Sequence, residues 1–313
     1  MKLYESTVHE LHEQLQNKQL SSVELTKAVY DRIDEVEEKI DAYVTLDREN
    51  ALAQAAKVDA MIAAGETIKP LAGVPGAIKD NISTKGLRTT CSSHILDNFI
   101  PVYDAHVIAN LRKDETIFLG KTNMDEFAMG STTETSYFKN THNAWNLDCV
   151  PGGSSGGSAA AIAAGEAIWS LGSDTGGSIR QPASFCGIVG LKPTYGRVSR
   201  FGLVAFASSL DQIGPMSKDV MDSAVMLDLI AGQDPRDTTS LPAEIPQGGF
   251  AGQLKDFKPD LKGMKIGLPK EYFEVEGVTP GVKKVTADAI ETLKSLGAEF
   301  VDISLPQIGR AHV

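Results

Sequence analysis

PGGSSGGS at residues 151–158 is the first of two glycine-rich stretches that lie close together in this chain, and GSDTGGSIRQP at residues 172–182 is the second. Glycine lets the backbone approach a ligand closely and adopt positive φ at little steric cost. A serine can become a nucleophile when a neighbouring group takes its proton. Tight turns before two helices would account for the glycines, but they account poorly for the cluster of Ser173, Thr175 and Ser178. The two stretches together therefore indicate a serine-based active site.

Two generic motifs fit the first stretch incompletely. Residues 152–156 have the G-x-S-x-G pattern of an α/β-hydrolase nucleophile, which requires a histidine later in the chain. The only histidine after Ser154 is His312, within the last residues of the chain. Gly152 and Gly157 also have the glycine spacing of a Walker-A loop, but Ser158 stands where that loop requires lysine. Neither motif is complete.

Lys79 is the candidate base. It follows the apolar run Val74–Ile78 and precedes Asp80 and Asn81. A lysine at the end of a buried strand can be desolvated, which lowers its pKa and favours the neutral amine. A neutral amine can act as a general base. An exposed lysine at a strand end is the alternative, and lysine is rarely buried.

Composition limits the class of protein. The chain has 313 residues, 42% of them apolar, and a net charge of −11, which allows a large core and disfavours extended contact with nucleic acid. Cys91, Cys149 and Cys186 are isolated, so neither a disulfide framework nor a thiolate metal site is predicted. No apolar run is long enough to span a bilayer, and the N-terminus lacks the apolar segment of a signal peptide. We therefore expect a cytoplasmic protein with no membrane partner.

Periodic patterns predict an α/β protein with a helical N-terminal segment at about residues 8–65. Ser21 and Glu24 form a capping-box pattern, and apolar residues recur after it at spacings of three and four. From about Pro70, short apolar runs alternate with helical patterns, as in a sheet covered by helices. The predicted strands are 74–78, 116–120, 264–268 and 299–303, the later predicted helices are 105–113 and 282–296, and segment 232–263 is predicted to be a surface connection.

Three stretches together resemble the amidase signature family: GAIKDN at 76–81, GGSSGGSA at 152–159, and residues 172–182. Within this family, residues 121–131 and 190–212 are similar to the A subunits of bacterial tRNA-dependent amidotransferases. The resemblance runs from near residue 1 to about residue 306. It implies the α/β amidase signature fold, with a mixed central β-sheet covered by helices on both faces. The expected division is an N-terminal helical segment at 1–65 that packs on the core, an incomplete amidase signature domain at 66–306, and a tail at 307–313.

The resemblance implies a Ser–cis-Ser–Lys triad. Ser178 is the acyl nucleophile, Ser154 is the bridging serine after a cis peptide bond, and Lys79 is the base. A hydroxyl can donate and accept at once, so Ser154 can relay a proton from Ser178 to Lys79. Backbone N–H groups of the second stretch would form an oxyanion hole. The further oxyanion-hole and substrate residues implied are Thr175, Gly176, Gly177, Met129, Gly130 and Ser131.

The implied substrate is glutamine, which is hydrolysed through an acyl-enzyme with release of ammonia. A partner, the B subunit, would use ATP and Mg²⁺ to activate glutamyl-tRNA and would receive the ammonia, so that Glu-tRNA(Gln) becomes Gln-tRNA(Gln). A small C subunit would stabilise the heterotrimer, and tRNA would bind mainly to the B subunit. No cofactor or metal is expected on this chain. A stand-alone amidase of the same family is one alternative, which residues 197–212 disfavour; a non-catalytic assembly subunit is the other, which the complete triad disfavours.

The C-terminal end departs from the family pattern. In the family, the residues that bind the α-amino and α-carboxyl groups of glutamine lie beyond position 313. Residues 307–313, QIGRAHV, follow a strand that lies mid-domain, and their back-translation resembles a sequencing adapter. We therefore predict a non-native tail, with poor stability and low glutaminase activity of the chain by itself.

Overall fold

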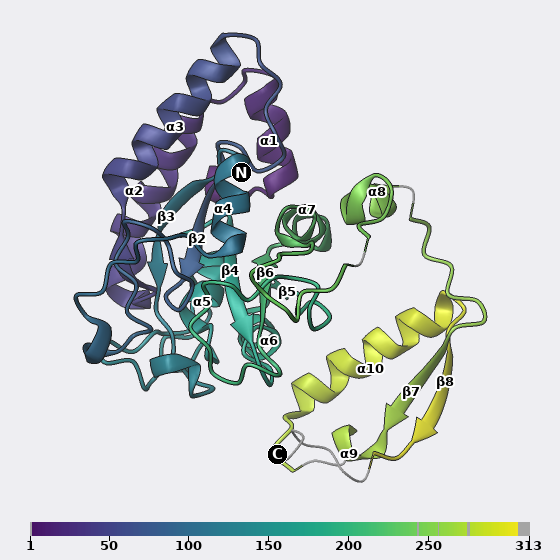
Figure 1. Cartoon of the computed structure of the whole chain (residues 1–313). Coiled ribbons are helices and arrows are strands. Elements are labelled where there is room, and N and C mark those ends of the chain that lie inside the picture. The colour runs from purple at the N-terminus through teal and green to yellow at the C-terminus, as the bar shows by residue number, and fades with distance from the viewer. Residues whose placement is uncertain (1, 243, 256, 274–275, 306–313) are drawn as a thin grey trace. The chain divides into compact units, whose positions relative to one another are not determined.

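The computed structural model describes residues 2–242, 244–255, 257–273 and 276–305 (Figure 1). The chain divides into two compact units, Met1–Leu254 and Lys255–Val313. This division does not test a boundary at residue 65, which stays a prediction. The predicted tail at 307–313 lies outside the described residues. Within the described ranges, no helix combines the length and apolar character needed to cross a membrane.

A six-stranded sheet forms the centre of the first unit. Its order is β1 (Tyr43–Leu46), β3 (Ile117–Thr122), β2 (Pro75–Lys79), β4 (Trp169–Asp174), β6 (Gln212–Ser217) and β5 (Val189–Gly190). β2 runs parallel to both of its neighbours, β3 and β4, and the other pairs are antiparallel. The mixed sheet is thus confirmed, as are the predicted strands at β2 and β3. Because β2 and β4 are parallel, their carboxyl ends lie at the same edge of the sheet.

The N-terminal segment contains α1 (Val8–Gln16), α2 (Ser22–Ile40) and α3 (Arg48–Ala63). Ser21 caps α2, because its Oγ accepts the Glu24 N–H at 3.0 Å. The prediction of helical structure throughout 8–65 is wrong at β1, which pairs with β3. Asp41 adopts a left-handed conformation that ends α2, and the aromatic and β-branched residues that follow favour extended backbone.

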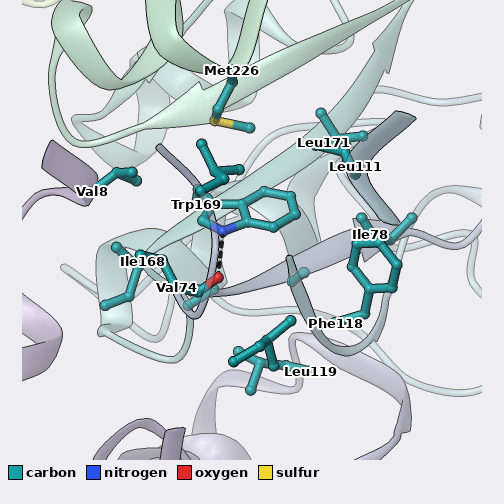
Figure 2. Close-up of a cluster of buried hydrophobic side chains, with 14 of the residues drawn as sticks. Val8, Val74, Ile78, Leu111, Phe118, Leu119, Ile168, Trp169, Leu171 and Met226 are labelled. Carbon is teal, nitrogen blue, oxygen red and sulfur yellow. Dashed lines mark hydrogen bonds between the residues drawn. The ribbon is translucent and has the colours of Figure 1, made fainter. Parts of the chain in front are cut away.

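Helices cover both faces of this sheet, as predicted (Figure 1). The helices that follow α3 in this unit are α4 (His106–Lys113), α5 (Gly156–Ala164), α6 (Arg180–Cys186) and α7 (Val220–Ile230), and its short 3-10 helices are Leu3–Glu5, His94–Leu96 and Glu126–Ala128. Successive residues of β4 point to opposite faces. Ser170 faces α5, where its Oγ donates to the Ser158 carbonyl at 3.0 Å. Trp169 therefore faces the other side, where it lies among apolar side chains that include Met226 of α7 (Figure 2).

Trp169 fixes the core on that second face. It is fully buried, and its indole N–H donates to the Val74 carbonyl at 3.0 Å (Figure 2). Phe118 of β3 meets the indole edge-on, with 6.4 Å between ring centroids. Strand β2, which carries Lys79, is thereby held between its two parallel neighbours, β3 and β4. Lys79 at its end is held in place with it.

The second unit contains a parallel pair of strands, β7 (Lys265–Pro269) and β8 (Glu299–Ile303), with α9 (Lys270–Phe273) and α10 (Pro280–Ser295). Both strands and α10 confirm the sequence prediction. The predicted connection 232–263 contains a helix that was not predicted, α8 (Gly249–Lys255). Its first amides, of Phe250 and Ala251, donate to the carboxylate of Asp228 in α7. A cap from a distant residue leaves no local sequence signal, which explains the omission.

Candidate active site

Lys79 lies at the centre of the candidate site. It is the last residue of β2, and its side chain is fully buried, as the strand-end interpretation predicted. Its Nζ lies 2.7 Å from the Oγ atoms of both Ser154 and Ser155. It also lies 2.9 Å from the Oγ and 3.3 Å from the carbonyl oxygen of Ser173. One nitrogen atom therefore contacts both glycine-rich stretches.

The electrostatics of this position favour a neutral amine. Burial lowers the pKa of Lys79 from 10.5 to about 7. The carboxylates of Asp125, Asp174 and Asp211 oppose this effect and keep the pKa from falling further. Lys79 consequently exchanges its proton near neutral pH, which is the property required of a general base.

The first stretch is fixed by buried polar contacts. The peptide bond between Gly153 and Ser154 is cis, as the family resemblance implies. The Thr133 hydroxyl donates to the Gly152 carbonyl at 2.8 Å and accepts the Gly156 N–H at 3.1 Å. Ser154 is fully buried. Its hydroxyl is therefore held against Lys79 and away from solvent.

Asp174 organises the second stretch. It ends β4, and its carboxylate accepts the N–H groups of Gly177 at 2.8 Å and Ile179 at 3.1 Å. The Arg180 guanidinium donates to the same carboxylate at 3.0 Å. Burial alone would raise the pKa of Asp174, but these donors hold it below its usual value. An ionised Asp174 thus folds residues 175–180 into a tight turn.

Thr175 is held from a different direction. Its hydroxyl donates to Asp211, whose carboxylate also accepts the N–H groups of Phe206 and Ala207. The loop that contains residues 206–211 therefore supports the start of the second stretch. Asp174 and Asp211 together fix both ends of the segment that carries the candidate nucleophile.

Ser178 is half-buried within this turn. Its carbonyl accepts the Ser155 N–H at 3.1 Å, so the two stretches touch through their backbones. Across the described ranges, no hydrogen bond joins the hydroxyl groups of Ser178 and Ser154. The structure brings Lys79 and Ser154 into direct contact, and it joins Ser178 to the neighbouring Ser155 through the backbone. The nucleophilic role of Ser178 stays a prediction.

The predicted oxyanion hole contains both free and engaged N–H groups. The Gly177 N–H donates to Asp174, so it is engaged within the loop. The N–H groups of Thr175, Gly176 and Ser178 have no acceptor in the part of the chain that the structure describes. These three are the available donors for a developing oxyanion, and their role stays a prediction.

The predicted substrate loop at residues 129–131 is exposed, with 69% of Met129 accessible to solvent. It wraps around Asp125, whose carboxylate accepts the N–H groups of Thr132 and Thr133 at 3.2 and 2.9 Å. A Cβ on Gly153 would collide with the Asp125 carboxylate and lie 2.9 Å from the Ser131 carbonyl carbon. The exposed loop therefore lies directly against the Gly153–Ser154 peptide.

Several residues that build the site had no predicted role. They are Ser155 and Ser173, which contact Lys79; Asp125, Asp174 and Asp211, which hold the loops; and Gln181, which links two loops. Most of them lie inside the two glycine-rich stretches, so the sequence located these residues but gave them no role. A buried strand that ends in aspartate, as β4 does, was the available signal for Asp174.

Two other groups of residues in the described ranges bear on disulfide and metal sites: the cysteines and a cluster of one histidine with two aspartates. Cys91, Cys149 and Cys186 are free thiols; Cys91 and Cys186 are buried, and Cys149 is exposed. The group of His9, Asp219 and Asp222 has ligand atoms close enough for a metal ion. However, Asp222 accepts the Val8 N–H at 2.8 Å, and Asp219 accepts the Asp222 N–H at 2.8 Å. These carboxylates therefore cap helices, and the prediction of no metal stays a prediction.

Comparison with known proteins gives a consistent match over almost the whole chain. Residues 24–313 match the family described as Amidase. The A subunit of glutamyl-tRNA(Gln) amidotransferase from Carboxydothermus hydrogenoformans is 60% identical over 306 residues, and that from Geobacter metallireducens is 57% identical. Each alignment covers 98% of this chain and 62% of the relative. The chain thus spans about 62% of the length of these curated relatives.

Solved structures share the fold. The A subunit of glutamyl-tRNA(Gln) amidotransferase from Thermotoga maritima superposes with a TM-score of 0.83 at 40% identity, covering 98% of this chain and 63% of that one. Native peptide amidase from Stenotrophomonas maltophilia superposes with a TM-score of 0.84 at 33% identity, covering 96% of this chain and 62% of that one. The fold at hand is therefore found in proteins whose names give them different roles.

Proposed function

This chain belongs to the amidase family, and from that premise we propose that it is the glutaminase part of a tRNA-dependent amidotransferase. The observation that carries the proposal is the contact of 2.7 Å between Lys79 Nζ and Ser154 Oγ, made by a lysine whose pKa is about 7. Two curated relatives at 60% and 57% identity are named as the A subunit of glutamyl-tRNA(Gln) amidotransferase, which supports the choice of reaction.

In the proposed acylation step, neutral Lys79 takes the hydroxyl proton of Ser154, and Ser154 takes that of Ser178. Ser178 Oγ then attacks the side-chain carboxamide carbon of glutamine. The oxyanion that forms would be bound by the free N–H groups of the second stretch, and such donors contribute about 10²–10³ in rate each. When the carbon–nitrogen bond breaks, the proton returns from Lys79 through Ser154 to the departing nitrogen, and ammonia leaves. Ser178 is then esterified.

In the proposed deacylation step, water attacks the ester carbonyl and gives its proton through the same relay to Lys79. The ester bond breaks, Ser178 regains its proton, and glutamate is released. The relay requires Ser178 Oγ to come within hydrogen-bond reach of Ser154 when substrate is bound. Catalytic hydrogen bonds are often long in the free enzyme and tighten in the substrate complex, so the free geometry is compatible with this step.

The ammonia would pass to a partner, the B subunit, that activates Glu-tRNA(Gln) with ATP and Mg²⁺, and a small C subunit would complete the heterotrimer. The charge of −11 supports this division of labour, because an acidic chain is poorly suited to hold most of a tRNA. We therefore assign the activation of Glu-tRNA(Gln) to the partner subunit and not to any residue of this chain.

Ammonia release from glutamine tests the proposal. The chain is co-expressed with its B and C partners, and the Ser178→Ala and Lys79→Ala variants are each expected to lose at least about 10³-fold in kcat/KM. Lys284→Ala is the matched control, because Lys284 is exposed in α10. Unchanged turnover in either site variant would contradict the triad. Equal turnover of other small amides without partners would favour a stand-alone amidase instead.

A further inference from the structure

Gln181 links the two sides of the candidate site through one side-chain amide. Its Oε1 accepts the Gly153 N–H at 2.9 Å, directly before the cis peptide to Ser154. Its Nε2 donates to the Ser131 carbonyl at 3.0 Å. Gln181 lies in the first turn of α6, three residues after Ser178. A single planar group thus joins the exposed loop 129–131 to the peptide that carries the bridging serine.

The surroundings fix this amide in place. The Gln181 backbone N–H donates to the Gly177 carbonyl at 2.8 Å. A Cβ on Gly152 would lie 2.5 Å from Gln181 Oε1 and 2.8 Å from Pro182 Cα. The first stretch therefore packs tightly against the start of α6, and the Gln181 side chain lies between this stretch and loop 129–131.

We propose that Gln181 is a positioning residue that ties the substrate loop 129–131 to the Gly153–Ser154 peptide. It thereby keeps the bound substrate in a fixed position relative to the bridging serine, Ser154. The proposal rests on the proposed function, because it assigns loop 129–131 to glutamine binding. It goes beyond the triad, in which Gln181 has no part. The side chain reaches the reaction only through the backbone groups that it holds.

The chemistry of the amide explains why glutamine serves this position. The link needs an acceptor for the Gly153 N–H and a donor for the Ser131 carbonyl, and both must belong to one planar group at the end of a side chain of this length. A glutamate can accept from Gly153 but has no proton for Ser131 when ionised. A methionine of similar length does neither. The two substitutions therefore separate the two halves of the link.

The two variants are measured in the complex with the B and C partners. For Gln181→Glu, KM for glutamine is expected to rise about 10-fold while kcat changes by less than about 3-fold, because only the loop contact is lost. For Gln181→Met, kcat is also expected to fall, with kcat/KM lower by about 100-fold. Gln16→Glu and Gln16→Met are matched controls, because the Gln16 Oε1 accepts the Ile68 N–H at 3.0 Å away from these loops. Both controls are expected to leave KM and kcat unchanged.

Hydrogen–deuterium exchange tests the link without any turnover. Gln181→Glu is expected to speed exchange in the peptide that covers residues 129–133 and to leave residues 150–156 protected. Gln181→Met is expected to speed exchange in both. Equal exchange changes in the two variants, or an unchanged KM in Gln181→Glu, would overturn the positioning role. If the wild-type complex releases no ammonia and a fluorophosphonate does not label Ser178, the proposed function fails, while exchange still decides whether Gln181 links the loops.

Discussion

The two glycine-rich stretches look alike in sequence but differ in burial. Every residue of 151–158 is buried, whereas 175–178 rises to partial or full exposure. The first stretch is held by neutral donors and acceptors such as Thr133, and the second by the ionised carboxylate of Asp174. Lys79 contacts both. We therefore interpret the first stretch as a fixed support and propose that the second stretch meets substrate.

Because of this difference, we expect substitutions in the two stretches to have different effects on activity and stability. A change that disturbs the second should remove activity while the protein stays folded, because the exposed turn contributes little to the core. A change that disturbs the first should lower the free energy of unfolding, because its residues pack among buried backbone. Substitutions in and around the two stretches should separate these outcomes, in order of expected size.

Among substitutions that leave the proposed triad intact, Asp174→Asn should give the largest effect on activity. The amide cannot accept from both Gly177 and Ile179 while facing Arg180, so the turn that carries Ser178 loses its shape. We expect kcat/KM to fall by about 10²–10³, the value of a lost oxyanion donor. Asp219→Asn is the control, because Asp219 caps α7 away from this turn. Urea unfolding should show similar, small stability losses in the two variants. Comparable activity losses in both would contradict the assignment.

Lys79 should impose a pH dependence on both activity and stability. Because the neutral amine is the base and its pKa is about 7, kcat/KM should fall about tenfold per pH unit below that value. Between pH 7 and 10.5 the unfolded chain binds a proton at this residue and the folded chain does not, so stability should rise with pH there. Lys79→Met should reduce the slope of the stability profile over this window in urea titrations, and Lys121 and Lys218, whose pKa values burial lowers to about 8, should keep the rest of it. A kcat/KM that stays flat down to pH 5 would contradict the role of Lys79.

The sequence was sufficient to locate the site but not to distribute its roles. Glycine and serine spacing identified both stretches, and the apolar run before Lys79 identified a buried strand end that the structure confirms. The Oγ atoms of Ser154 and Ser155 both lie 2.7 Å from Lys79 Nζ, and residue spacing alone cannot decide which of the two serines has the bridging role. Asp211 reaches Thr175 from 36 residues away, so no local pattern could pair them. Long-range partners of this kind appear only when the sheet order is known.

Gly157→Ala should act on stability. A Cβ there would lie 2.5 Å from the Asn123 carbonyl oxygen and 2.6 Å from that of Ala42, both backbone atoms that cannot move aside cheaply. We expect a loss of about 1–3 kcal/mol in unfolding free energy, the usual cost of overpacking. Gly252→Ala is the control, since that helical glycine of α8 has no heavy atom within 4 Å of a Cβ.

Gly177→Ala completes this comparison from the other stretch. Its Cβ would approach nothing closer than 3.8 Å, but its φ of +122° disfavours any side chain. We expect a larger loss of kcat/KM than of stability in this variant. Thermal unfolding and ammonia release measured on all three variants decide the matter, and equal destabilisation by Gly157→Ala and Gly252→Ala would refute the fixed-support interpretation.

Glu166→Gln should give the smallest effect, at the far end of the helix that the first stretch begins. Glu166 is fully buried, and neither carboxyl oxygen has a hydrogen-bond partner in the described ranges. Burial, and then the nearby Glu37 carboxylate, raise its pKa well above 4.5. Above pH 4.5 the unfolded chain loses this proton while the folded chain keeps it, so the group costs stability as pH rises. Glutamine stays neutral, and the variant should therefore gain about 1 kcal/mol over wild type at about pH 8 but less at about pH 5. Urea titrations at both pH values, with the exposed Glu291→Gln as control, decide the point, and a gain independent of pH would show that Glu166 is ionised in the fold.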